Sequence, residues 1–453
     1  MCRRKRKQLF VAFNTILFLF LFFTACTSAG SKKQIIESPN RDGQVKCDGV
    51  EILTYATIDL DKLDLDLVNQ FNQNHETVQI EVCDYSDKEG RKRLLTEISA
   101  GLIPDIMDMN SSIPYQRLAK GGYLENLWPY IESDPVLGRD QLLEAPLKAA
   151  EVNGKLYIAF DSVVVYTMVG AERVVGNRTS WSLNDLQKAF SSMPENSTIT
   201  EYTCDKYDML QNMLPGCLDD YVDWETGQCF FDSDNFRKIL EFLDSFPLVG
   251  DTMKSEEDFI RINDEVYWKR QNGQQMLTNA CIHELGAINF YDGYFGESAC
   301  FVGYPVEDGS VGSYFSIRGN TLAMSSTCRN KEAAWDFIKQ VFQPKGITND
   351  TLPEVIPINQ HTFSKSIQIS LNREPYGVFQ LYGPPEELRP LTSNDVQRYK
   401  EYINSIDKID LFDSAIYYIV EESCGPYFAG DKSLDETAQL IQNRVTLYVN
   451  EQK

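Results

Sequence analysis

Residues 101–108 have the sequence GLIPDIMD, and this stretch ends in the pattern of a short buried strand. Because Pro104 disfavours helix at Ile103, it separates this strand from the helix expected before it. Upstream, residues 50–56 (VEILTYA) and 78–82 have strand patterns, and each is followed by apolar residues at helical spacing. The order strand, helix, strand, helix, strand predicts an α/β fold with a parallel sheet.

The rest of the chain continues this mixture of strands and helices. The expected elements are strands at residues 155–160 and 163–169, and helices after Ser182, at 237–246, at 331–342 and after Ser433. The two serines are each followed three residues later by an acidic residue, which is the spacing of a capping box at a helix start. At 453 residues the chain exceeds what one hydrophobic core usually spans, so two lobes are expected.

Residues 1–25 have the pattern of a signal peptide. Basic residues at 3–7 precede an apolar run at 9–23, and that run is shorter than the ~20 residues of a membrane-spanning helix. Small residues precede Cys26 as in a bacterial lipobox, which predicts a lipid on Cys26 and a polar tether over 26–46. The alternative is an uncleaved N-terminal anchor.

Charge and ligand spacing argue against several classes of partner. The formal net charge is −23, and removing residues 1–25, which hold five basic and no acidic side chains, would take it to −28. This charge repels nucleic acid. The chain has no C-x-x-C pair, and its three histidines lie far apart in sequence, so we expect no metal and no cofactor. Nine of the 11 cysteines lie outside the signal and the lipidation site, and their pairing is left open.

Sequence signatures of catalysis are missing. The chain contains no G-x-S-x-G, H-E-x-x-H, G-x-x-x-x-G-K-[ST] or G-x-G-x-x-G motif, so no enzymatic activity is expected. A carboxylate pair of glycosidase type remains an alternative, because 66 acidic residues offer many pairs. Aromatic residues make up 12% of the chain, and Tyr and Trp rings are suited to stacking on sugar rings.

Six short motifs follow one another along the chain. They are residues 100–106 (AGLIPDI), 121–127 (GGYLENL), 152–157 (VNGKLY), 273–276 (GQQM), 330–338 (NKEAAWDFI) and 427–433 (YFAGDKS). In this order they resemble motifs of the extracellular solute-binding proteins of ATP-driven (ABC) importers, family 1, the group that includes maltose-binding protein. Gln275 stands where that family usually has Ala.

The resemblance implies an α/β, two-lobed periplasmic-binding-protein-like fold of type II. Crossing hinge strands near Asp161, Thr278 and Arg318 would join the lobes, and a ligand cleft would lie between them. The implied division is 47–160 plus 285–320 for lobe one and 161–284 plus 321–453 for lobe two.

The resemblance also implies a function. The protein would be a monomeric, non-catalytic receptor, held by Cys26 on the extracytoplasmic face of the cell membrane. It would capture a carbohydrate, an oligosaccharide in our interpretation, and deliver it to the permease subunits of the transporter. A receptor for a non-sugar solute and a surface-anchored hydrolase are the alternatives.

Candidate ligand-binding residues follow from position, because ligands in open α/β sheets lie beyond strand ends. They are Tyr55, Asp59, Met109, Asn110, Ser111, Asp161, Asn279 and His283. Tyr would stack on a sugar ring, and Asp and Asn would bond its hydroxyls. Met109 and Ile282 stand near positions where maltose-binding protein has Trp and acidic groups, so the same ligand is not implied.

Overall fold

The computed structural model describes most of the chain beyond its N-terminal part. The described residues are 35–36, 49–61, 63–109, 113–201, 204–248, 255–307, 310–348, 352, 354–373 and 388–451. The predicted signal peptide and Cys26 lie outside them, as does nearly all of the predicted tether.

Eleven strands occur in the described chain. They are β1 (Ile35–Ile36), β2 (Glu51–Thr57), β3 (Val78–Asp84), β4 (Ile106–Asp108), β5 (Ala159–Ala171), β6 (Val222–Asp223), β7 (Gln228–Cys229), β8 (Leu277–Ile282), β9 (Ala299–Phe301), β10 (Tyr314–Met324) and β11 (Ile356–Pro357). Nine of them form one sheet in the order β1-β3-β2-β4-β10-β5-β11, with β8 and β9 also paired to β5. The pairs among β1 to β4 are parallel, whereas β10 is antiparallel to both β4 and β5.

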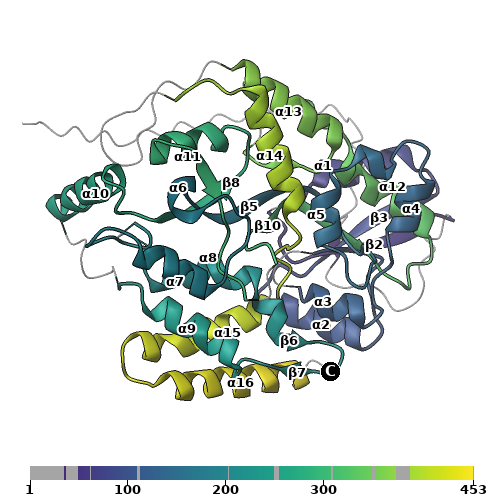
Figure 1. Cartoon of the computed structure of the whole chain (residues 1–453). Coiled ribbons are helices and arrows are strands. Elements are labelled where there is room, and N and C mark those ends of the chain that lie inside the picture. Colours follow the sequence, from purple (N-terminus) through teal and green to yellow (C-terminus); the bar gives the residue numbers. More distant parts are fainter. Residues whose placement is uncertain are drawn as a thin grey trace, which may run out of the picture. The chain divides into compact units, whose positions relative to one another are not determined.

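Sixteen α-helices surround these strands in the described chain (Figure 1). The first eight are α1 (Leu65–Asn74), α2 (Gly90–Ser99), α3 (Tyr115–Lys120), α4 (Trp128–Ser133), α5 (Glu144–Ala149), α6 (Glu172–Val175), α7 (Leu183–Ser191) and α8 (Lys206–Met213). The others are α9 (Asp234–Asp244), α10 (Glu256–Gln271), α11 (Ala287–Phe295), α12 (Lys331–Ile338), α13 (Gln360–Asn372), α14 (Ser393–Ser405), α15 (Ser414–Phe428) and α16 (Leu434–Glu451). None of the described helices combines the length and hydrophobicity needed to cross a bilayer.

The predicted order strand, helix, strand, helix, strand is confirmed by β2, α1, β3, α2 and β4. Tyr55 of β2 pairs with Val82 of β3 on one side and with Ile106 of β4 on the other, both in parallel. The two strands predicted at 155–160 and 163–169 are wrong in detail, because the structure has one continuous strand there, β5, which begins at Ala159 and ends at Ala171. It pairs with β10 on both sides of Asp161, so the backbone continues without a break.

Local capping chemistry explains the helix starts that the sequence predicted. Ser182 Oγ accepts a hydrogen bond from the Asp185 N–H (3.1 Å), which begins α7. Before α16, the Ser433 N–H donates to Glu436 Oε2 at 2.9 Å, as a capping box requires. The helix predicted at 331–342 is α-helical only as α12 and continues as a 3-10 helix over Lys339–Phe342.

The buried apolar side chains form two separate clusters. The first cluster contains side chains of α2, α3 and α12, and the second contains side chains of α8, α9, α15 and α16. Figure 1 shows α9, α15 and α16 side by side. The short strand β9 contributes to both clusters, and so do three longer strands. In β5, for example, Val163 belongs to the first cluster and Met168 to the second, and β8 and β10 divide in the same way.

The three longer strands are those predicted to cross between lobes. The predicted lobe boundaries stay a prediction, since a hydrophobic cluster is a packing unit and does not define a lobe.

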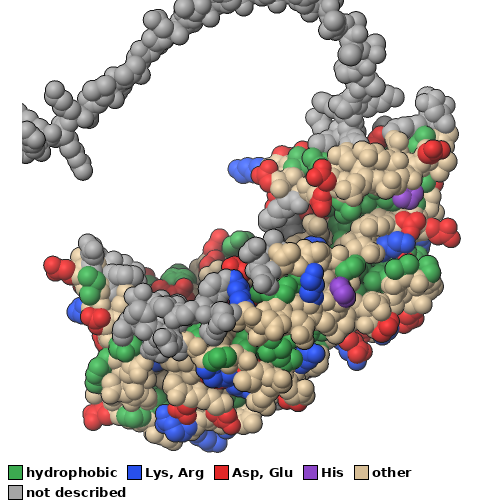
Figure 2. Space-filling model, turned by 90° about the horizontal axis from the view of Figure 1, so that it is seen from above, with side chains coloured by type: hydrophobic (Ala, Val, Ile, Leu, Met, Phe, Trp, Pro, Cys, Tyr) green, Lys and Arg blue, Asp and Glu red, His purple; other side chains and the backbone are tan. Residues whose placement is uncertain are grey.

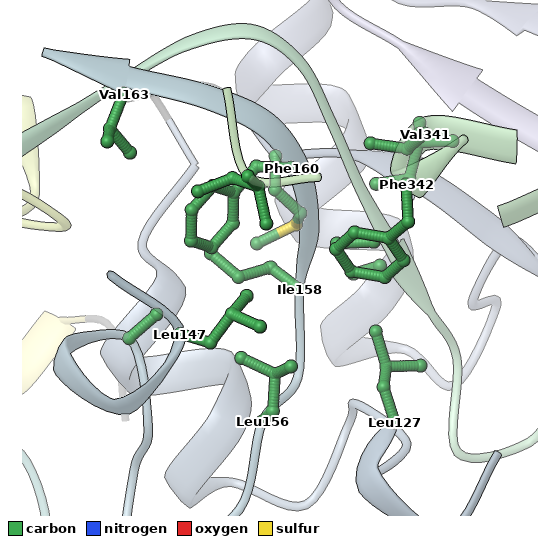
Figure 3. Packing of buried hydrophobic residues seen from close by; sticks show 14 of the residues in the cluster. Leu127, Leu147, Leu156, Ile158, Phe160, Val163, Val341 and Phe342 are labelled. Atoms are coloured by element: carbon green, nitrogen blue, oxygen red, sulfur yellow. The ribbon is translucent and has the colours of Figure 1, made fainter. Parts of the chain in front are cut away.

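The first cluster is closely packed around the start of β5. Figure 3 shows Phe160 among Leu147, Leu156 and Ile158, with Phe342 and Val341 nearby. Phe160 and Phe342 are fully buried. This packing fixes the position of the strand that carries Asp161 and so supports the neighbouring cavity.

Candidate functional site

A cavity of about 590 Å³ lies at the carboxyl ends of two parallel strands. Tyr55 near the end of β2, and Asp108 and Met109 at the end of β4, form one wall. Ile113 and Tyr115 at the start of α3 continue this wall. The cavity therefore occupies the edge of the sheet at which α/β folds usually bind ligands.

A β-bulge forms the second wall. Arg318 of β10 pairs with Ser162, and Thr321 pairs with Phe160, so Gly319 and Asn320 both lie opposite the single residue Asp161. Residues 316–321 all line the cavity. Gly319 has a φ of +77°, and a Cβ at this position would collide with the Asp161 carboxylate.

The third wall is the segment 410–412, which directly precedes α15. It is tied to β10, because the Asp410 N–H donates to the Phe315 carbonyl (2.7 Å). Leu411 packs against the first cluster and Phe412 against the second. The cavity wall is therefore in contact with both packing units.

Arg318 is the main cation of the cavity. Its guanidinium donates to Ser316 Oγ at 2.8 Å, to the Ile317 carbonyl at 3.1 Å and to the Tyr166 hydroxyl at 2.9 Å. These contacts hold the planar group in place beside the cavity. A fixed guanidinium provides directed hydrogen-bond donors for hydroxyl or carboxylate oxygens of a ligand.

Asp410 lies close to this cation. Burial raises the pKa of Asp410 to about 7, although a hydrogen bond with Ser316 and the charge of Arg318 oppose the shift. Asp219 lies near enough for its charge to raise the pKa of Asp410 further. The carboxyl group therefore changes protonation near neutral pH, and it can act as donor or acceptor towards a ligand.

Tyr55 and Met109 are the predicted site residues that the structure brings together at the cavity. Tyr55 is also a core residue: it is 6% exposed, and its ring lies 5.7 Å from that of Phe337 in an edge-to-face arrangement. Burial raises the pKa of its hydroxyl well above the ordinary value, and the charge of Asp108 adds to this. Tyr55 thus contributes an edge of its ring and not an exposed face.

Asp59 and Asp161 lie beside the cavity without lining it. The Asp59 N–H donates to Thr57 Oγ1 (3.1 Å), which lies 3.3 Å from Asp108 Oδ2. Asp161 is buried, and its carboxylate accepts from Ser162 Oγ (2.6 Å) and pairs with Lys345 Nζ (2.6 Å). The backbone of Asp59 and the carboxylate of Asp161 thus contact residues next to the cavity wall.

The other predicted site residues are not placed at the cavity. Asn279 Nδ2 lies 3.2 Å from Cys204 Sγ and 3.4 Å from Met209 Sδ, among side chains of the second cluster. His283 follows β8 and is half-buried outside the cavity lining. Asn110 and Ser111 lie outside the described residues.

Several lining residues were missed by the sequence reasoning. The glycine within the strand pattern at Gly319 was a signal, since an isolated glycine in a strand often marks a bulge. Asp108 was quoted within the strand but not proposed as a ligand contact. Nothing in the local sequence pointed to Asp410 or Phe412, which reach the cavity through pairing with a distant strand.

The described side chains form neither a metal site nor a continuous basic track. Within this part of the chain, no group of three or more His, Cys, Asp or Glu residues is arranged to hold a metal ion. Seven of its cysteines, Cys83, Cys204, Cys217, Cys281, Cys300, Cys328 and Cys424, are free thiols. On the face shown in Figure 2, basic side chains (blue) are interspersed with acidic ones (red) and do not form a continuous track for a phosphate backbone.

The solved structures that are similar to this chain include sugar-binding and solute-binding proteins. The sugar-binding protein MalE from Xanthomonas citri matches with a TM-score of 0.51 at 15% identity, over 88% of this chain and 98% of that chain. A putative oligosaccharide periplasmic-binding protein from Synechococcus sp. MITs9220 matches with a TM-score of 0.48 at 14% identity, over 88% and 99%. A family 1 extracellular solute-binding protein from Alicyclobacillus acidocaldarius matches with a TM-score of 0.47 at 14% identity, over 88% and 98%.

The match to MalE confirms the predicted fold class, an α/β periplasmic-binding-protein-like fold. The resemblance drawn from the six sequence motifs is therefore confirmed at the level of the fold. No family model and no curated protein sequence matches the chain.

Proposed function

We propose that this protein is the substrate-binding component of an ABC importer, and that it captures a carbohydrate in the cavity beside the β10 bulge. In this proposal the ligand is an oligosaccharide, and the protein delivers it to the permease subunits as a monomer. A lipid on Cys26 holds it at the extracytoplasmic face of the cell membrane. It has no catalytic role.

The composition of the cavity wall carries the proposal. Aromatic side chains (Tyr55, Tyr115 and Phe412) alternate there with groups that can bond hydroxyls (Asp108, Arg318 and Asp410). The Tyr115 hydroxyl already donates to the Ala150 carbonyl at 2.8 Å, so this residue offers its ring alone. Apolar ring surface combined with charged hydrogen-bonding groups suits a sugar, which has apolar C–H faces and a rim of hydroxyls.

Two further observations support the proposal. MalE from Xanthomonas citri, which shares the fold, is named a sugar-binding protein. The basic and apolar N-terminal segment followed by Cys26 supports export and lipidation.

A thermal-shift screen tests the ligand class. We expect one class of mono- or oligosaccharide to raise the melting temperature in a saturable way, whereas amino acids and polyols leave it unchanged. A ligand at ~100 times its dissociation constant stabilises the native state by ~2.7 kcal/mol, which corresponds to a shift of a few degrees. A shift with amino acids alone would overturn the choice of a carbohydrate.

Asn320 provides a test of the cavity itself. It lines the cavity and is half-buried, so Asn320→Ala removes a polar contact without opening the core. We expect sugar affinity to fall about tenfold, the effect of losing roughly 1.4 kcal/mol, with little change in melting temperature. Asn177→Ala, at an exposed position outside the cavity, is the matched control. Equal affinities of the two variants would place the ligand elsewhere.

A surface hydrolase is the second candidate. Asp108 and Asp410 line the same cavity, and the pKa of Asp410 is raised to about 7 by burial, as a general acid requires. Incubation of the protein with each saccharide that binds, followed by an assay for new reducing ends, separates the two functions. We expect no product; product formation that is lost in Asp410→Asn would establish the hydrolase.

A further inference from the structure

A second cavity, of about 330 Å³, lies at the other end of α3. Arg117, Lys120 and Tyr123 line it on the side of α3, and Trp224 and Glu225 line it from the turn between β6 and β7. No part of the proposed function has assigned a role to this cavity.

The two sides of this cavity belong to different packing units. Leu118 of α3 is fully buried in the first cluster, whereas Trp224 packs against the second cluster. A ligand held here would therefore contact both units, as a ligand in the first cavity does. Binding at such a boundary is coupled to any movement of the two units relative to one another.

Trp224 has an unused hydrogen-bond donor. Its indole nitrogen is buried and has no hydrogen-bond partner among the described residues. A buried polar group without a partner costs free energy, and a ligand oxygen would remove that cost. The ring also offers apolar surface, and Tyr123 provides a second ring in the cavity lining.

The charges around the cavity are mixed. Arg117 donates to Ser99 Oγ (3.3 Å). Burial raises the pKa of Asp219 to about 7, and the nearby charge of Lys120 opposes this shift. Glu225 adds a carboxylate to the lining itself. Cations balanced by carboxylates do not select an anion, but they provide both donors and acceptors for hydroxyl groups.

We propose that this cavity is a second sugar subsite, which takes a further ring of the same oligosaccharide. The inference rests on the proposed function. Tyr115 lines the first cavity and Lys120 the second, and these residues lie roughly 7.5 Å apart along the axis of α3. At 100° per residue, Tyr115 and Lys120 also project from different faces of α3, so a ligand that fills both cavities must contain more than one ring and pass around this helix.

A ladder of gluco-oligosaccharides tests this subsite. The full chain and its variants are titrated calorimetrically with α-1,4 and β-1,4 ladders, from one ring to about five. We expect the affinity of the unaltered protein to rise with length. Trp224→Ala should lower the affinity for the longer oligosaccharides about tenfold and leave the affinity for the shortest ligand that binds unchanged.

Two further variants make the result specific. Trp224→Phe keeps a ring and loses the indole N–H, so we expect an intermediate loss and no change in fold. Trp268→Ala is the matched control, because Trp268 is 56% exposed on α10 and lines neither cavity. Ligand-induced quenching of tryptophan fluorescence should disappear in Trp224→Phe and persist in Trp268→Ala.

The outcomes separate this inference from the proposed function. If saccharides bind and Trp224→Ala has the same affinity as the unaltered protein at every length, the second subsite is wrong and sugar capture stands. If no saccharide of any length binds the unaltered protein, sugar capture fails, and the subsite fails with it.

Discussion

The buried environment of Asp410 makes the stability of the protein depend on pH. Its folded pKa, about 7, is raised by burial above the ordinary carboxyl value near ~3.9. A raised carboxyl pKa means that the neutral form is favoured in the folded state. The contribution of Asp410 to the free energy of unfolding is fully present at a pH below the pKa that the group has in the unfolded chain. It is lost as the pH rises through about 7, the pKa in the folded protein.

We predict that Asp410→Asn stabilises the protein at alkaline pH. The variant cannot ionise, so its free energy of unfolding at pH ~8 should exceed that of the unaltered protein by about 1 kcal/mol or more. At pH ~4 the difference should vanish, because Asp410 is then neutral in both states. Urea denaturation at the two pH values measures this, and exposed Asp431→Asn is the control. A variant that is less stable at pH ~8 would contradict the raised pKa.

Tyr55 combines a core role with a cavity role, and two substitutions separate them. Because the ring is buried against Phe337, we predict that Tyr55→Ala lowers the free energy of unfolding by ~3 kcal/mol or more. Tyr55→Phe keeps the ring and should leave the melting temperature within a few degrees. Thermal denaturation tests stability, and sugar affinity of the Phe variant tests the hydroxyl. Equal stabilities of both variants would show that the ring is not a core contact.

At the scale of elements, an ion-pair network joins α11 to α14 and to the segment before it. Asp292 of α11 lies 2.5 Å from Arg389 and 2.9 Å from Arg398 of α14, and Arg389 also pairs with Asp395 at 2.7 Å. Burial would raise the pKa of Asp395, but hydrogen bonds from Arg389 and Thr392 dominate and hold it well below its usual range. Asp395 is also part of the capping box of α14.

We predict that Asp395→Ala destabilises the protein by ~2 kcal/mol, because it removes the buried carboxylate that accepts hydrogen bonds from Arg389 and Thr392. Thr392→Ala removes only the cap and should cost ~1 kcal/mol. A depressed carboxyl pKa contributes stability that is present above ~4 and is lost as the pH falls. The difference in free energy of unfolding between Asp395→Ala and the unaltered protein should therefore become smaller as the pH is lowered, which acid denaturation curves measure. If that difference stays constant with pH, ionisation of Asp395 is not the cause of the lost stability.

The elements that the sequence predicted correctly are those that local chemistry determines. The strand and helix alternation up to β4 follows from apolar spacing, and the starts of α7 and α16 follow from their capping boxes. The division of β5 into two strands was wrong, because pairing with β10 holds the backbone extended through Asp161. Such pairing depends on a distant segment and leaves no mark in the local sequence.

The lining residues of the cavity differ in the same way: some are placed by local sequence and others by pairing with distant segments. Tyr55 and Met109 were found because strand ends are local features and ligands collect beside them. Phe412 was missed because it reaches the cavity through the pairing of its segment with Phe315. Asn279 was chosen by its place beyond a motif, yet its side chain turns into the second cluster, since adjacent residues of a strand face opposite sides.

At the scale of the whole molecule, a polar contact joins the helices of the two clusters. Arg91 of α2 lies 3.3 Å from Asp413 Oδ1, and the Tyr448 hydroxyl of α16 donates to Asp413 Oδ2 at 2.5 Å. Asp413 also caps α15, and it directly follows the cavity residue Phe412. The contact between the clusters is thus continuous in the chain with the cavity wall.

We predict that Arg91→Ala weakens sugar binding, although Arg91 lines neither cavity. In the proposed function the ligand contacts both units, so a contact that joins them supports the arrangement that binds. The apparent affinity falls in proportion to the population of that arrangement. A decrease of about threefold, measured calorimetrically, corresponds to ~0.7 kcal/mol, within the range of a partly exposed ion pair. Lys92→Ala, at an exposed position on the same helix, is the control. An affinity equal to that of the unaltered protein would show that the Arg91–Asp413 contact does not contribute to ligand binding.

The bulge in β10 has a consequence for how the cavity lining can change. Gly319 and Asn320 lie between two paired positions. Gly319 is constrained by its φ of +77° and by Asp161, but the side chain of Asn320 can be exchanged while the hydrogen bonds on either side keep their partners. The strand pairing of the sheet therefore does not depend on which side chain the bulge presents to the cavity. A substitution at this one position can therefore change the shape and polarity of the cavity without refolding the sheet that forms it.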